Sequence, residues 1–328
     1  MKLNSVSVIM AIMLCAQGFS QSPSAPDNPR CVTNGLIAFG RRDQNYNRQI
    51  FTENPDGSNQ NQLTFEGDNG RPNWSPDGKK IVFQTQRDGN MWVGIMEADG
   101  SNQKLLGPGS EPDWSPDGKQ IAFCSVEGQI WAMRPDGSNR VQVTKSATYK
   151  RAPSWSPDGK RMVFTLVKNP GSLTDPQTRV GIMNSDGTNE RILTTEDRTN
   201  VRVEPDGSVT VLETAHDAGV PSWSPVEDKI TFWSGIARQY GQIWVINADG
   251  TGSKQLTETP NHRSSDNPTW SPDGKQILFD TGRSGRVVEF WVMDADGKNQ
   301  RRVSDIHRLH GGRGSWQPVP CDPARKGE

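Results

Sequence analysis

Four histidines gather in the second half of the chain, and imidazole can bind a metal or transfer a proton near neutral pH. They lie shortly before three tryptophans, at His216, His262, His307 and His310. If His216, His262 and His310 converge, three imidazoles could bind a transition metal or include a general base. The alternative is that they are unrelated exposed histidines in loops.

Arginine offers a second chemistry, because its planar guanidinium binds carboxylates and phosphates. Arg71 and Arg313 each precede a tryptophan by three residues, so we expect them at equivalent positions. Glu111 has the same spacing in another copy, so ion pairing is the alternative to binding an external anion. Arg151 and Asp266, in the corresponding segments of two further copies, complete this set of polar candidates.

Trp233 and Tyr240 are the aromatic candidates. Trp233 stands where the equivalent residues of other copies are Gln84, Cys124, Thr165 and Asp280. Trp233 together with Tyr240 could offer a stacking surface for a sugar or a peptide. Packing inside the fold is the alternative.

A repeated segment must position all of these residues. Its clearest copy reads Trp74-Ser-Pro-Asp-Gly-Lys followed by Ile81-Val-Phe83, and further tryptophans stand at 114, 155, 223, 270 and 316. Pro presets φ and Gly accepts positive φ, so Ser-Pro-Asp-Gly-Lys predicts a tight turn between two strands.

A second Asp-Gly turn follows in every copy, and Asp-Gly between β-rich segments is a strong hairpin signal. These turns lie at Asp56, Asp99, Asp136, Asp186, Asp249 and Asp296. The tryptophan segments and the Asp-Gly turns each number six, which indicates six repeated units. Four strands per unit and the spacing of the units are typical of β-propeller blades. We therefore predict an all-β, six-bladed propeller; a two-sheet sandwich with accidental repeats is the alternative.

The repeat resembles that of TolB-type (PD40, WD40-like) propellers, in which Trp-Ser-Pro-Asp-Gly-Lys-x-Ile-x-Phe precedes Ile-Trp-x-Met and Asp-Gly-Ser/Thr-Asn. The resemblance covers almost the whole chain after its first segment, and implies the fold more than a function. TolB itself carries an additional N-terminal α/β domain, for which this chain has no room. The Gly-x-Ser-x-Gly motif of peptidase-linked hydrolase domains is absent.

Antiparallel blades would place the two tight turns on one face of the ring. The loops between second and third strands and the crossovers between blades would lie on the other, where lengths vary and binding residues are more common. We call these the tight-turn face and the variable face. All four histidines fall on the predicted variable face.

The chain ends are expected to complete one blade together. The first copy lacks an inner strand, and the last copy, at Trp316, supplies only an inner strand. Cys31 and Cys321 flank this junction, so we predict a disulfide between them in place of the missing turn. Two free thiols are the alternative.

The sequence start predicts export. Residues 1–20 combine Lys2 with a short apolar core, as in a secretory signal peptide. A polar, Pro-rich tether (21–30), the propeller (31–321) and a short tail (322–328) follow. A net charge of −1 and the absence of a long apolar segment after the start do not favour a nucleic-acid binder or a membrane-spanning protein.

The favoured interpretation is a secreted or periplasmic binding protein, expected to be a monomer, that recognises a protein or an acidic glycan through the variable face. No cofactor motif is present. The alternative is a lyase for acidic, uronate-containing oligosaccharides, with a divalent metal held by the three histidines in the channel. Some oligogalacturonate lyases are propellers with such a metal centre, but no motif of that family is present.

Overall fold

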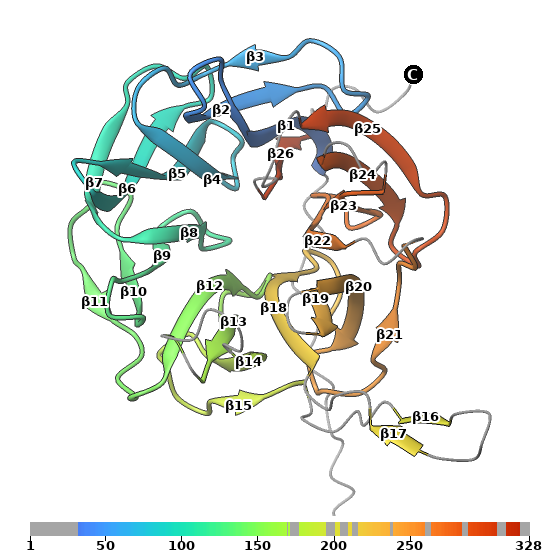
Figure 1. The fold of residues 1–328 in the computed structure, drawn as a ribbon. Coiled ribbons are helices and arrows are strands. Elements are labelled where there is room, and N and C mark those ends of the chain that lie inside the picture. The colour runs from blue at the N-terminus through green and yellow to red at the C-terminus, as the bar shows by residue number, and fades with distance from the viewer. Residues whose placement is uncertain are drawn as a thin grey trace, which may run out of the picture.

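The computed structural model describes residues 32–168, 170, 177–194, 201–203, 209–211, 216–236, 239–259, 264–283, 288–306 and 313–321. Six four-stranded antiparallel sheets stand around a central channel as the blades of a propeller (Figure 1). The predicted all-β, six-bladed fold is therefore confirmed. Among these residues there is no helix with the length and apolar character needed to cross a membrane.

Each blade has four strands that follow one another from the channel outward. Blade one contains β26 (Ser315–Pro320), β1 (Val32–Arg42), β2 (Arg48–Glu53) and β3 (Asn61–Gln62). Blade two contains β4 (Asp68–Trp74), β5 (Lys80–Arg87), β6 (Asn90–Glu97) and β7 (Lys104–Pro108). Blade three contains β8 (Ser110–Trp114), β9 (Ile121–Cys124), β10 (Ile130–Met133) and β11 (Val141–Gln142).

The second half of the ring follows the same order. Blade four contains β12 (Tyr149–Trp155), β13 (Arg161–Val167), β14 (Thr178–Asn184) and β15 (Arg191–Ile192). Blade five contains β18 (His216–Trp223), β19 (Lys229–Ile236), β20 (Gln239–Asn247) and β21 (Lys254–Gln255). Blade six contains β22 (Ser265–Trp270), β23 (Gln276–Thr281), β24 (Val288–Asp294) and β25 (Arg301–Ile306).

The ring closes at blade one, where the last strand pairs with the first. β26 lies antiparallel to β1, with Val32 opposite Pro320 and Ile37 opposite Trp316. Cys31 lies outside the described residues, so the disulfide stays a prediction, although this register brings the flanking residues of the two chain ends together.

The apolar core consists of six clusters, one between each pair of neighbouring blades. Between blades six and one, for example, Leu278 and Phe290 pack with Phe39 and Trp316. The other five clusters join blades one to six in sequence. Because burial of apolar area is the main stabilising term, the blades depend on one another and hold the channel wall in place.

The tight turns satisfy their own polar groups. In the first, the Ser75 hydroxyl donates to Asp77 Oδ1 (2.6 Å) and accepts from the Lys80 amide (2.9 Å). Gly78 takes a φ of 70° there. The turns at Ser115, Ser156 and Ser271 repeat both hydrogen bonds. In blade five, which lacks the aspartate, Ser224 instead accepts from the amides of Val226 and Glu227.

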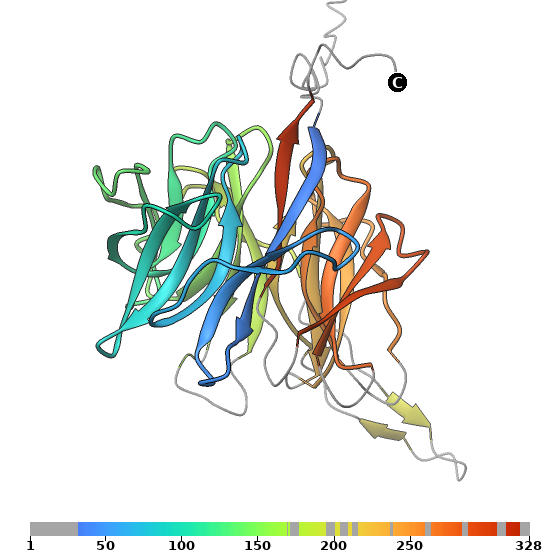
Figure 2. The ribbon, with the colours of Figure 1, turned by 90° about the horizontal axis from the view of Figure 1, so that it is seen from above.

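An insertion between blades four and five lies on the opposite, variable face. An extra hairpin, β16 (Val201–Val203) and β17 (Val209–Val211), lies between β15 and β18. Figure 2 shows this hairpin at the opposite end of the ring from the start of β1 and the end of β26. The antiparallel pairing thus separates the chain into the two predicted faces.

Candidate ligand site in the central channel

The inner strands of five blades share one irregularity. The pairing of each with its neighbour shifts register, so that two inner-strand residues oppose one, as in a β-bulge. The first of the two has a φ near 50° and precedes a proline; these residues are Arg71, Glu111, Ala152, Val220 and Asn267. Proline has no N–H for the sheet, which suits a bulge. Five blades therefore present different side chains from one backbone position.

Arg71 and Glu111 form an ion pair across neighbouring blades. Arg71 Nη2 lies 3.2 Å from Glu111 Oε1, and the two side chains retain 25% and 11% exposure. The Ala152 amide donates to Glu111 Oε2 (2.6 Å). Burial alone would raise the pKa of Glu111, but Arg71, Arg151 and Arg313 outweigh it and hold the pKa below its usual value. The pairing foreseen as an alternative from the sequence is present.

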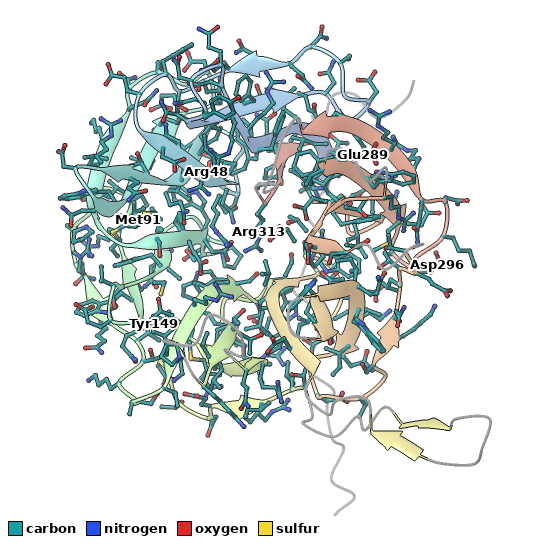
Figure 3. The ribbon with its side chains drawn as sticks, viewed as in Figure 1. Arg48, Met91, Tyr149, Glu289, Asp296 and Arg313 are labelled. Atoms are coloured by element: carbon teal, nitrogen blue, oxygen red, sulfur yellow. The ribbon has the colours of Figure 1, made fainter. Side chains whose placement is uncertain are left out.

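Arg313 completes a group of three arginines around this carboxylate. Figure 3 places Arg313 in the central channel. Its Nη2 donates to the Pro221 carbonyl at 3.3 Å. Burial lowers the pKa of Arg313, although Asp113 opposes this. We call Arg71, Arg151 and Arg313 the arginine triad.

A buried aspartate, Asp113, interacts with Arg313. It accepts hydrogen bonds from the Asn73 side-chain amide and from the Trp155 backbone amide, the latter at 3.0 Å. Burial nevertheless raises the pKa of Asp113 to about 6, even with Arg313 nearby. The protonation of this group therefore changes near pH 6.

Blade six contributes an acidic pair. Asp266 and Asp280 are direct cross-strand partners on β22 and β23. The Asn267 amide donates to both carboxylate oxygens of Asp280, at 3.2 and 3.1 Å. Burial raises the pKa of Asp280 to about 6, and burial together with Asp280 raises the pKa of Asp266 well above its usual value. Arg71 acts on Asp280, which links this pair to the arginine triad.

The structure brings together only some of the residues proposed from the sequence. Arg71, Arg151 and Arg313 meet around Glu111, whereas Asp266 joins Asp280. Trp233 is 8% exposed, and its indole packs so closely on Gly241 that a Cβ there would lie 1.5 Å from Nε1. The side chain of Tyr240 lies outside the described residues, so a stacking surface for a sugar or a peptide stays a prediction.

The histidine hypothesis also stays a prediction. His262 and His310 lie outside the described residues, and His216 is described only as the first residue of β18. Within the part of the chain that the structure describes, no three His, Cys, Asp or Glu side chains are grouped to hold a metal.

Two acidic residues of the channel were not proposed from the sequence as site residues. Asp113 stands directly before its tryptophan, where other copies have Asn73, Ser154, Ser222, Thr269 and Ser315. Asp280 follows the phenylalanine of its second strand, at the position compared above for Trp233. In both cases the available signal was a carboxylate at a position where these other copies have none.

The comparisons with known proteins identify the family. A family model described as the TolB beta propeller domain (PD40) matches residues 43–218, more than half of the chain. The chain belongs to the TolB β-propeller family. None of the curated proteins matches it.

Solved structures with the same fold include TolB from Acinetobacter baumannii, with a TM-score of 0.66 and 18% identity. That match covers 86% of this chain and 66% of the other, so the chain spans slightly less than two thirds of that protein. A chain of a nidogen/laminin complex has a TM-score of 0.64 at 11% identity, with 87% and 99% covered. An oligogalacturonate lyase in complex with manganese has a TM-score of 0.54 at 14% identity, with 84% and 74% covered. At these identities the likeness shows the fold alone.

Proposed function

We propose that this TolB-family propeller is a secreted or periplasmic binding module that docks a partner protein on its variable face. The observation that supports the proposal most directly is the contrast between the two faces. The tight-turn face consists of short turns whose polar groups hydrogen-bond within each turn. The variable face carries the loops that differ between blades, as expected where a rigid scaffold presents a binding surface.

Large apolar side chains project from the described loops of the variable face. Tyr46 is 59% exposed in the loop between β1 and β2, and Phe65 is 71% exposed in the crossover from blade one to blade two. Val126 is 72% exposed in the loop between β9 and β10. Exposed aromatic and aliphatic side chains beside arginines are typical of protein interfaces, which favours a protein over a glycan as the partner.

Export is part of the proposal. Residues 1–20 have the charge and apolar pattern of a secretory signal, and the family resemblance is to TolB-type propellers. We propose that the exported module acts as a monomer.

Site-specific photo-crosslinking tests the choice of face. A benzophenone amino acid replaces Phe65 or Val126 on the variable face, and Val226 (57% exposed) on the tight-turn face as the matched control. In cells that produce the full chain, positions 65 and 126 should crosslink one common protein, and position 226 should not. Crosslinks to that protein from position 226 alone would overturn the assignment.

The crosslinked partner is then purified for calorimetry. Phe65→Ser should weaken its binding about fivefold or more, because truncating an interface anchor costs about 1 kcal/mol or more. Unchanged affinity would count against the proposed surface, and fractionation that finds the mature chain only in the cytoplasm would refute export.

A further inference from the structure

The arginine triad has more hydrogen-bond donors than the surrounding acceptors use. Each guanidinium offers five N–H donors. Among the described residues, Arg71 Nη1 and Arg151 Nε are buried and have no hydrogen-bond partner. Buried donors without partners are uncommon in folded proteins and indicate capacity for another acceptor.

The charge around the triad points to the same conclusion. Glu111 is the one carboxylate of the group whose pKa is held low. Asp113 and Asp280, which also act on the triad, are easier to protonate because of burial. Three permanent positive charges therefore face one firmly ionised carboxylate and two carboxylates that give up their charge near pH 6.

Arg48 shows how an arginine paired with a carboxylate differs. On the same face, its Nε and Nη2 donate to the two carboxylate oxygens of Asp68 at 2.8 and 3.1 Å. That bidentate pair uses one edge of the guanidinium, formed by Nε and Nη2. This rim arginine is thus paired side-on with a carboxylate of its own chain, whereas Arg71 Nη1 and Arg151 Nε are buried without such a partner among the described residues.

The triad is accessible from the variable face. The inner strands run from the variable face toward the tryptophan at the tight-turn face. Arg151 is two residues from the start of β12 and Arg71 three residues from the start of β4. At about 3.3 Å per residue, they lie roughly 7–10 Å below the strand ends. Arg71 and Glu111 retain solvent exposure at this depth.

We propose that Arg71, Arg151 and Arg313 form a carboxylate-binding site in the channel, which takes an acidic side chain of the partner protein beside Glu111. This inference rests on the proposed function and names the chemistry that enters the channel. Arg71 and Arg151 supply the unused donors, and Arg313 adds positive charge near Glu111. Glu111 holds the triad together and also repels the incoming carboxylate.

Calorimetry with a blocked acetyl-triglutamate peptide tests the site on the full mature chain at low salt, where charge interactions are least screened. The peptide should bind, and acetyl-triglutamine should not. The double variant Arg71→Lys/Arg151→Lys should weaken binding at least tenfold, because lysine keeps the charge but loses the planar fork. Arg134→Ala, an exposed arginine on the tight-turn face, should leave binding unchanged.

Glu111→Gln should strengthen peptide binding, in contrast to the lysine double variant. Glutamine keeps an oxygen for the Ala152 amide but removes the negative charge beside the incoming group, so triglutamate should bind severalfold more tightly. Weaker binding in this variant would contradict the proposed role of Glu111.

A second measurement covers variants that fold poorly. Glu111→Ala removes a carboxylate from the triad, so added acetate should raise its melting temperature more than that of the wild type. The same acetate should have no larger effect on Arg134→Ala than on the wild type. Equal acetate effects in all three proteins would overturn the inference.

Other outcomes separate the two proposals. No triglutamate binding, or equal binding by the lysine double variant, would refute the arginine site. Preference for trigalacturonate or inorganic phosphate over the peptide would refute the peptide assignment. If the crosslinked partner binds the lysine double variant as tightly as the wild type, the site is wrong while the binding module stands.

Discussion

The tight-turn face and the channel wall use one repeated backbone in opposite ways. At the tight-turn face, near-identical residues recur in blade after blade and satisfy one another's hydrogen bonds. At the channel wall, equivalent bulge positions carry arginine, glutamate, alanine, valine and asparagine. The repeated turns specify the scaffold, and the divergent positions give this propeller its individual chemistry.

The difference extends to protonation. The turn aspartates, such as Asp77, have lowered pKa values: burial opposes this, but the Ser75 hydroxyl and the Lys79 amide outweigh it. The channel aspartates, such as Asp113, have raised pKa values because burial prevails. The ionised form of aspartate is therefore favoured on the tight-turn face and disfavoured at the channel wall.

The largest predicted effect concerns the seam that keeps the channel closed. Cys31→Ser/Cys321→Ser should lower the free energy of unfolding by up to about 5 kcal/mol if the predicted disulfide joins the chain ends, since the bond would close nearly the whole chain. Urea unfolding with and without reductant measures this. The wild type should lose stability in reductant, and the double variant should not respond.

Cys124→Ser serves as the control, because Cys124 is a buried free thiol. The reductant effect should persist in it. Mass spectrometry of the unreduced mature protein that finds free thiols at both Cys31 and Cys321 would disprove the bond.

The next prediction compares an aspartate of each region by pH. The folded-state pKa of Asp113 is about 6, above the unfolded value of about 3.9, so the folded state binds the extra proton between these values. The stabilising effect of that proton is complete below about pH 4 and is lost as the pH rises through 6. The free energy of unfolding of Asp113→Asn, measured relative to that of the wild type, should therefore rise by about 2 kcal/mol between pH 4 and pH 7.

Asp77→Asn is the matched substitution on the tight-turn face, and its sign is opposite. The lowered folded pKa of Asp77 stabilises the protein above the unfolded pKa, and this is lost as the pH falls through the folded value. The stability that Asp77→Asn loses relative to the wild type should therefore be larger at pH 7 than at low pH. Parallel pH profiles for the two variants in urea unfolding would show that the regions do not differ.

Sequence reasoning predicted the scaffold well because each local signal agreed with the global fold. The Trp-Ser-Pro-Asp-Gly turn, the Asp-Gly turn and the incomplete first and last copies all indicated six blades with a shared seam, and the strand pairing confirms this. Such agreement between local and overall preferences is expected of a repeat protein.

The channel was predicted only in part. Equal spacing from the tryptophan placed Arg71, Glu111 and Arg313 together. It could not show that Asp113 and Asp280 join them, because these come from two other strand positions. Their raised pKa values depend on burial, which spacing alone does not reveal. The variable loops and their histidines are fixed by no repeat, so the sequence offered no rule for placing them.

The smallest predicted effect tests whether the tight turns are equivalent. Asp77 accepts hydrogen bonds from the Ser75 hydroxyl and the Lys79 amide, at 2.6 and 3.1 Å. Asp77→Ala should therefore cost about 1 kcal/mol. Asp117, Asp158 and Asp273 accept the same pair of bonds in their own turns, so each alanine variant should cost a similar amount. If the free energies of unfolding from urea titrations differ among the four variants by more than about 1 kcal/mol, the turns, like the channel positions, have individual roles.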